Sequence, residues 1–367
     1  MGPSVEAVGV SRFSPISLAC PIVQAPMAGG PSTQALAAAV SGAGGLGFLA
    51  AGYKSPQDSQ REIDELRTLL ADDVPFGVNL FLPSSHASAT AEITAYAERL
   101  SDEAKHRGVT LGAPQWDDDG YQEKLDQLCI RPVPVVSFTF GCPAAADVDR
   151  LQAVGSAVWV TVTTVEEARA AQTAGADALV VQGVEAGGHR GGFDDAHPGD
   201  IGLLALLQLV NVALAGAMPL IASGGLSTGY GVAGVLAAGA AAAQIGTAFM
   251  LTPEAGTGTA HRDMISQGGR PTALTRAFTG RTARGISNRF LREHSDQAPS
   301  AYPEVHNLTN PLRAAARSAG DTEGFHLWAG QTYSLAHPAP AAEIVQQLTT
   351  DAAKALQHAQ ERLKRLP

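Results

Sequence analysis

One histidine of this chain stands in a setting that suggests chemistry. His189 lies in the stretch QGVEAGGHRGGF, directly after the apolar run 178–183. Gly187 and Gly188 permit a tight turn that presents the imidazole. Because an imidazole changes charge near neutral pH, we expect His189 to act as a general base or as an electrostatic partner. Gln182, at the end of the same run, can offer a donor and an acceptor to a planar heterocycle.

Two turns later in the chain have the composition of anion-binding loops. Glycines let backbone N–H groups approach an anion closely, and a following helix adds a favourable dipole. Together, on adjacent strands, the two turns favour a phosphate; the alternative is that their glycines merely make tight turns. Their residues are Ser223, Gly224 and Gly225 in the first turn and Gln244, Ile245, Gly246 and Thr247 in the second.

The first apolar runs supply a second wall for such a ligand. Ala25-Pro26-Met27 joins a proline-fixed backbone to a flexible thioether, which is suited to packing under a flat ring. Asn79 is the one strongly polar side chain in FGVNLFLP. Since a buried amide must find partners, a polar ligand is one interpretation and a satisfied core asparagine is the other.

Three further motifs are read as structural. The glycines of 42–47 match GxGxxG, but they follow a predicted helix and open a strand, so we expect a helix C-cap with close packing and no nucleotide. The acidic run Asp117–Asp119 is expected to be a solvated loop or helix cap. Asp194, Asp195 and His197 match no metal-binding spacing, and no metal site is predicted.

Eight short apolar runs must position these residues. They do not alternate with polar residues, which is typical of parallel strands covered on both faces. Helix-like segments at 32–43, 55–70 and 164–174 lie between some of them, so an α/β fold of the (β/α)₈ TIM-barrel class is predicted, with a doubly wound sheet as the alternative. The runs are 22–27, 45–50, 76–82, 133–140, 157–162, 178–183, 220–225 and 242–250.

The remaining segments suggest a smaller, α-rich cap or substrate domain over the mouth of the barrel, where ligands bind in this fold. We assign 1–83 and 131–250 to the barrel, 84–130 and 251–335 to the cap, and 336–367 to a closing C-terminal helix.

Composition excludes several classes of function. The 367 residues are 45% apolar and carry a net charge of −10, which argues against a nucleic-acid partner. Three cysteines without CxxC spacing fit a reducing compartment. The apolar stretch 203–222 is interrupted by polar residues and proline, so we expect a buried helix followed by a buried strand and no membrane span. The first 13 residues show no export signal, and a cytoplasmic location is expected.

These segments together resemble the nitronate monooxygenases, over nearly the whole chain. The late LWAGQ at 327–331 resembles the class I branch, whereas Cys142 stands where an aliphatic residue is usual. The resemblance rests on PIVQAPMAGG, GAGGLGFLAAG, FGVNLFLP, VSFTFGCP, QGVEAGGHRGGF, LIASGGL, AAQIGTAFM and TGRTARGISNRF, in that order.

The resemblance implies an FMN-binding barrel in which His189 is the catalytic histidine. It implies oxidation of an alkyl nitronate, such as propionate 3-nitronate, by O₂ to a carbonyl compound and nitrite. Tyr302, Arg313 and Tyr333 are candidates to meet a substrate carboxylate, and a homodimer is possible. The cofactor contacts are expected at Ala25, Pro26, Met27, Asn79 and Gln182 for the ring and ribityl chain, and at Gly187, Gly188, Ser223, Gly224, Gly225, Gln244, Ile245, Gly246 and Thr247 for the phosphate end.

Three alternatives stay open. A flavin-dependent enoyl-acyl-carrier-protein reductase would share the barrel and the glycine-histidine loop but would require NADH or NADPH. A barrel dehydrogenase would need a loop cysteine, for which Cys142 is the candidate. The third alternative is a flavin-binding sensor without turnover.

Overall fold

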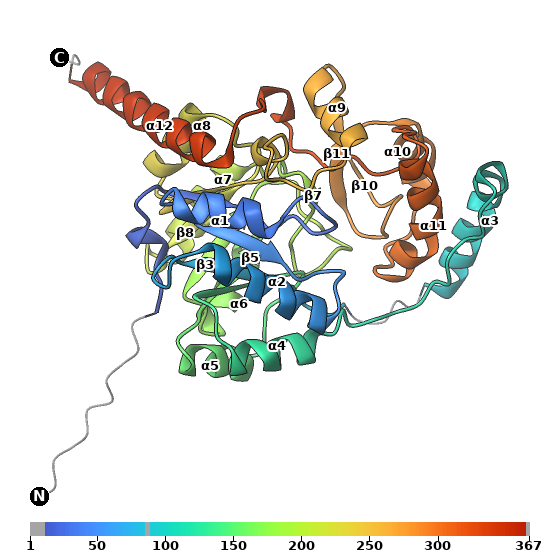
Figure 1. Ribbon diagram of the computed structural model, residues 1–367, viewed down its shortest axis with the longest axis horizontal. Coiled ribbons are helices and arrows are strands. Elements are labelled where there is room, and N and C mark those ends of the chain that lie inside the picture. The colour runs from blue at the N-terminus through green and yellow to red at the C-terminus, as the bar shows by residue number, and fades with distance from the viewer. Residues whose placement is uncertain (1–11, 85–88, 365–367) are drawn as a thin grey trace, which may run out of the picture.

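The computed structural model describes residues 12–84 and 89–364, so the predicted lack of an export signal concerns residues that lie almost wholly outside it. Eight parallel strands form a barrel in the order β1-β9-β8-β6-β5-β4-β3-β2, and a bridge between Val23 and Leu46 joins its two ends. The predicted TIM barrel is confirmed (Figure 1). The strands are β1 (Ile22–Gln24), β2 (Gly47–Ala50), β3 (Phe76–Phe81), β4 (Val135–Thr139), β5 (Ala157–Val162), β6 (Ala178–Gln182), β8 (Leu220–Ser223) and β9 (Ala242–Ile245).

Helices cover the outside of this barrel. The three helices expected from the sequence are confirmed as α1, α2 and α6, and each begins where the hydroxyl of Thr33, Ser55 or Thr164 accepts a backbone N–H. Apolar side chains fill both the barrel interior and the layer between strands and helices. The helices are α1 (Gln34–Gly42), α2 (Pro56–Leu69), α4 (Tyr121–Ile130), α5 (Ala145–Ala153), α6 (Val165–Thr173), α7 (Leu203–Ala213) and α8 (Gly229–Ala237).

Two details of the apolar runs refine the predictions. The last strand ends at Ile245, and Thr247–Phe249 form a 3₁₀ turn that the predicted strand 242–250 had included. The stretch 203–222 contains α7 and β8, but α7 buries one face and leaves Val212 80% exposed. In the described part of the chain, no helix is long and apolar enough to cross a membrane.

The glycines of 42–47 have the predicted structural role. Helix α1 ends at Gly42 and β2 begins at Gly47. A Cβ atom on Gly47 would lie 2.1 Å from the carbonyl oxygen of Ala37, which shows how closely the helix and strand pack.

The cap contains the predicted helices and a sheet that was not predicted. Helix α11 packs against α3 although about 200 residues separate them (Figure 1). The sheet has the order β10-β11-β7, and its third strand, β7 (Gly188–His189), belongs to the loop after β6. The other cap elements are α3 (Thr90–Arg107), α9 (Thr259–Gln267), β10 (Thr272–Thr275), β11 (Ala283–Ile286), α10 (Arg289–His294) and α11 (Glu304–Ser318).

The contacts of two helices are relevant to the predicted domain boundaries, which remain a prediction. Helix α4 contacts α2, α5 and β3, and these contacts favour grouping it with the barrel. Helix α12 (Ala341–Leu363) packs against α8 and α1, as expected of a helix that closes on the barrel (Figure 1).

Candidate active site

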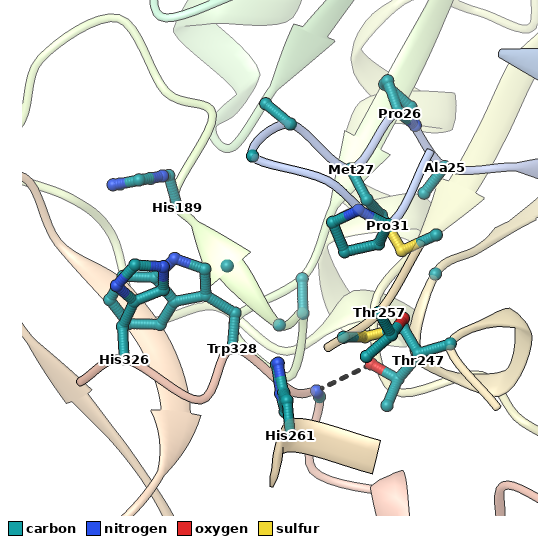
Figure 2. Close-up of a pocket in the computed structure, with 18 of the residues that line it drawn as sticks. Ala25, Pro26, Met27, Pro31, His189, Thr247, Thr257, His261, His326 and Trp328 are labelled. Atoms are coloured by element: carbon teal, nitrogen blue, oxygen red, sulfur yellow. Dashed lines mark hydrogen bonds between the residues drawn. The ribbon is translucent and has the colours of Figure 1, made fainter. Parts of the chain in front are cut away.

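A cavity of about 1030 Å³ lies at the carboxyl ends of the barrel strands and extends under the cap. The loop after β1 and residues of β3, β4, β5, β6, β8 and β9 meet residues of the cap around it. Figure 2 shows Met27 of that loop opposite His326 and Trp328 of the cap. Most of the predicted site residues are brought together here. Those that line the cavity are Ala25, Pro26, Met27, Asn79, Gln182, Gly187, Gly188, His189, Ser223, Gly224, Gly225, Gln244, Gly246, Thr247 and Arg313.

Three predicted residues do not line it. The side chain of Ile245 is buried in the core between barrel and helices. The hydroxyl of Tyr333 donates to the carbonyl oxygen of Arg270 at 2.8 Å and accepts from its N–H, so this tyrosine supports the cap. Tyr302 lies just behind the wall, with its ring centroid 5.9 Å from that of His189.

The two glycine turns have free donors. Gly224 and Gly225 have φ values of 118° and 66°, a conformation that favours glycine, and a Cβ on Gly225 would lie 2.8 Å from the Cβ of Glu185. Among the described residues, no hydrogen bond uses the N–H groups of Gly224, Gly225 or Gly246. At the second turn, Thr247 accepts the N–H of Gly330 at 3.0 Å (Figure 2). Unused N–H groups that face a cavity are suited to an anion.

Asn79 is held by the barrel and still faces the cavity. Its Nδ2 donates to the carbonyl and hydroxyl oxygens of Ser137, the latter at 2.9 Å, and to the hydroxyl of Thr139 at 3.0 Å. Within the described residues, nothing donates to its Oδ1. The NH₂ group of Asn79 is therefore satisfied within the core, as the first interpretation expects. Its Oδ1 is left for a polar ligand, as the second interpretation expects.

Gln182 holds the loop that carries the histidine. Its Nε2 donates to the carbonyl oxygen of His189 at 3.1 Å, and its Oε1 accepts from the N–H of Gly191 at 2.8 Å and from Arg190. The acceptor is thus occupied within the protein, and one N–H of the amide is left for a ligand.

His189 is enclosed by rings and by positive charge. Its Nε2 lies 2.9 Å from the hydroxyl of Thr279, and the rings of Phe140 and Trp328 have centroids 5.7 and 5.5 Å from its own. Burial, followed by the charges of Arg281 and Arg313, lowers the pKa of His189 to about 3. The imidazole is therefore neutral at pH 7.

Arg313 is a buried cation without a counter-ion. Its side chain is 3% exposed, and it donates to the carbonyl oxygen of His306 at 2.7 Å and to Thr309. No described carboxylate forms an ion pair with it. Burial lowers the pKa of Arg313 to about 10, so it stays charged at pH 7. A buried charge normally has a partner, and here the cavity is open to an anionic one.

The cap face contains residues that the sequence did not reveal as part of a site. His306 of the cap stacks on Tyr53 of the loop after β2, with centroids 4.4 Å apart. His326 stacks on Trp328 at 5.0 Å (Figure 2). They come from separate segments of the chain, so no local motif unites them. The exception is α11, where helical spacing of His306 and Arg313 could have indicated a shared face.

The acidic segments have structural partners. Asp195 accepts from Arg276 at 2.8 Å and from the N–H of Thr282, while Asp194 faces His197 at 3.0 Å on the surface. Asp119, in the run expected to be a solvated loop or helix cap, lies just before α4 and pairs with buried Lys124 at 2.8 Å. Within the described ranges, no group of three or more His, Cys, Asp or Glu side chains is arranged to hold a metal ion.

A parallel eight-stranded barrel with a polar cavity at its carboxyl end, a buried neutral imidazole and an unpaired guanidinium defines an enzyme of the TIM-barrel class. Comparison with known proteins identifies its family. The family model described as nitronate monooxygenase matches residues 11–351, so the chain belongs to the nitronate monooxygenase family and is an oxidoreductase.

Individual relatives agree with this assignment. A probable nitronate monooxygenase of Staphylococcus aureus is 36% identical over 94% of this chain and 97% of its own length. The structure is similar to that of a nitroalkane oxidase from Streptomyces ansochromogenes, with a TM-score of 0.90 and 50% identity over 93% of this chain and 98% of the other. FabK from Thermotoga maritima is also similar, with a TM-score of 0.74 and 27% identity over 95% of this chain and 96% of the other.

Proposed function

We propose that this enzyme uses FMN and O₂ to oxidise alkyl nitronates that carry a carboxylate, propionate 3-nitronate among them, to a carbonyl compound and nitrite. Family membership supports oxidation of nitronates or nitroalkanes. The finer proposal is carried by one observation: the unpaired guanidinium of Arg313 lines the same cavity as His189 and the glycine turns.

The residues present fit FMN. Gly224, Gly225 and Gly246 offer unused N–H groups to its phosphate, and the left-handed turn has no room for a Cβ on Gly225, which would collide with the side chain of Glu185. Asn79 and Met27 line the same cavity and would contact the ring and ribityl chain. A bound FMN would supply the redox chemistry between the nitronate and O₂.

His189 acts as a neutral group in this proposal. A protonated His189 was one of two expected roles, but a pKa of about 3 leaves no positive imidazole at neutral pH to attract the anion. A base with so low a pKa also has little driving force to take a proton from carbon. Both arguments favour substrates that arrive already as nitronates, with the imidazole placed to orient the reacting carbon.

Arg313 meets the carboxylate of the substrate. The guanidinium is fixed through His306 and Thr309, so it can pair with a planar anion without being reoriented. Tyr302, behind the wall, supports the chamber through its ring contacts with Phe140 and His189.

The alternatives receive unequal support. Cys142 is absent from the cavity lining and burial raises the pKa of its thiol, which argues against a cysteine-dependent dehydrogenase. The second candidate is the flavin-dependent reductase that uses NADH or NADPH, because it would need the same barrel and glycine-histidine loop. A cytoplasmic location and a homodimer also stay predictions. The three cysteines form no disulfide in the structure, which is compatible with the reducing compartment that we expect.

The purified protein tests this proposal. We expect the visible spectrum of a bound flavin, and oxygen consumption with nitrite release when propionate 3-nitronate is added without NADH or NADPH. Because His189 orients the reacting carbon, His189→Asn should keep its flavin and lose turnover by about 100-fold. A colourless protein that gains no colour with FMN would overturn the cofactor, a need for NADH would favour the reductase, and full turnover of the variant would remove His189 from the reaction.

A further inference from the structure

The cavity continues beyond Arg313 to a second guanidinium. His306, Asn310, Arg313 and Arg317 all line it, and they follow one another along α11 at the spacing i, i+4, i+7, i+11. This spacing places side chains on one face of a helix. At 1.5 Å per residue the face runs roughly 16 Å. It leads from the neighbourhood of His189 to the exposed Arg317 at the rim.

His326 lies between the two guanidinium groups. Its Nδ1 is 3.4 Å from Nη1 of Arg313, and its Nε2 is 3.5 Å from Nη2 of Arg317. A neutral imidazole has one lone pair and one N–H, so it cannot accept from both. Burial and the two arginines lower the pKa of His326 far below its ordinary value, so it neutralises neither charge. The stacked ring of Trp328 holds it in place (Figure 2).

No described acidic side chain neutralises this row. Arg317 forms no ion pair with the residues that the structure describes, and Asp263 on α9 is the one carboxylate among those lining the cavity. The whole chain carries a net charge of −10 and so repels anions at a distance. A local row of guanidinium groups at the mouth of a low-dielectric cavity offsets that repulsion.

We propose that Arg317 and His326 form an outer anion-binding site at the mouth of the cavity, which takes the carboxylate of an incoming substrate before Arg313 does. That this substrate is a nitronate rests on the proposed function, whereas the site itself follows from the two guanidinium groups. Its ligand class is a small dianion, with a carboxylate at one end and a second planar anion at the other.

Succinate is a suitable probe, because a carboxylate and a nitronate are both planar anions with two oxygens and succinate contains no nitro group to be oxidised. We would measure its Kd by titration calorimetry on protein supplied with FMN. Arg317→Gln should weaken binding about fivefold, the upper range for an exposed ion pair, and Arg317→Lys should restore most of it. Arg61→Gln, which removes the same charge from exposed Arg61 on α2, is the matched control.

The kinetic counterpart uses propionate 3-nitronate. Arg317→Gln should lower kcat/KM about fivefold with kcat unchanged. As ionic strength rises, kcat/KM should decline less steeply in this variant than in the unaltered enzyme. Equal succinate affinities in Arg317→Gln and Arg61→Gln would overturn the outer site. If succinate behaves as expected but no nitronate is oxidised, the anion site stands and the proposed function fails.

Discussion

His189 and Arg313 line the same cavity but differ in charge at neutral pH. Burial and neighbouring guanidinium groups keep the imidazole neutral, while Arg313 keeps its proton because the ordinary pKa of arginine is so high. The proposed function therefore assigns attraction of the substrate to Arg313 and contact with its reacting carbon to His189. The sequence could indicate both residues, yet the charge of His189 depends on Arg281 and Arg313, which come from distant segments.

This division predicts a substrate-dependent effect of Arg313. Arg313→Gln should raise KM for propionate 3-nitronate about tenfold or more, since a hydrogen bond between charged groups contributes about 1.5–3 kcal/mol. Ethyl nitronate, which has no carboxylate, should change much less, and Arg313→Lys should fall between. The measurement is steady-state oxygen consumption with both substrates. An equal rise in KM for the two would show that Arg313 does not bind the carboxylate.

At the scale of elements, the buried parallel strands were the most predictable part. Continuous apolar runs and hydroxyl-capped helices are local signals, and they placed the glycine turns at the correct end of the barrel. The sheet β10-β11-β7 was missed because β7 is two residues long and pairs Gly188 with Arg284 across almost a hundred residues. No periodicity of the sequence records such a pairing. That the side chain of Ile245 lies in the core was missed for a related reason, since an apolar strand covered on both faces does not show in its sequence which side chains point toward the helices.

Substitutions in the glycine turn after β8 can test whether this turn holds the cofactor. Gly225→Ala forces a Cβ against Glu185 in a left-handed backbone conformation, so the turn must move and FMN should bind at least about tenfold more weakly. Gly258→Ala is the matched control, because Gly258 lines the same cavity and nothing lies within 4 Å of its added Cβ. Fluorescence titration of FMN measures both. Equal affinities in the two variants would show that the turn does not hold the cofactor.

For the whole molecule, the buried histidines predict how stability depends on pH. The pKa is lowered to about 3 in His189 and to about 2 in His306, and it is far below the ordinary value in His326, in each case chiefly by burial. In the unfolded chain these groups titrate near 6.5. Below that pH the unfolded chain binds protons that the native protein does not, so the free energy of unfolding falls as the pH falls.

Thermal unfolding between pH 7 and pH 5 tests this expectation. Each histidine contributes a slope of at most about 1.4 kcal/mol per pH unit below about 6.5, so Tm should drop clearly at pH 5. His306→Gln removes one of these groups and should show a shallower decline than the unaltered protein. A Tm that is the same at both pH values would mean that the native state accommodates the protons.

The shared sheet of β7 and β11 also limits how this enzyme can recombine with its relatives. His189 pairs with Ala283, and the N–H of Arg190 donates to the carbonyl oxygen of Thr282 at 2.8 Å. A chimera with a crossover near residue 251 would take one half of that ladder from each parent. Such a hybrid would inherit a complete barrel and still misalign its imidazole, unless 188–190 and 282–284 were exchanged as a unit.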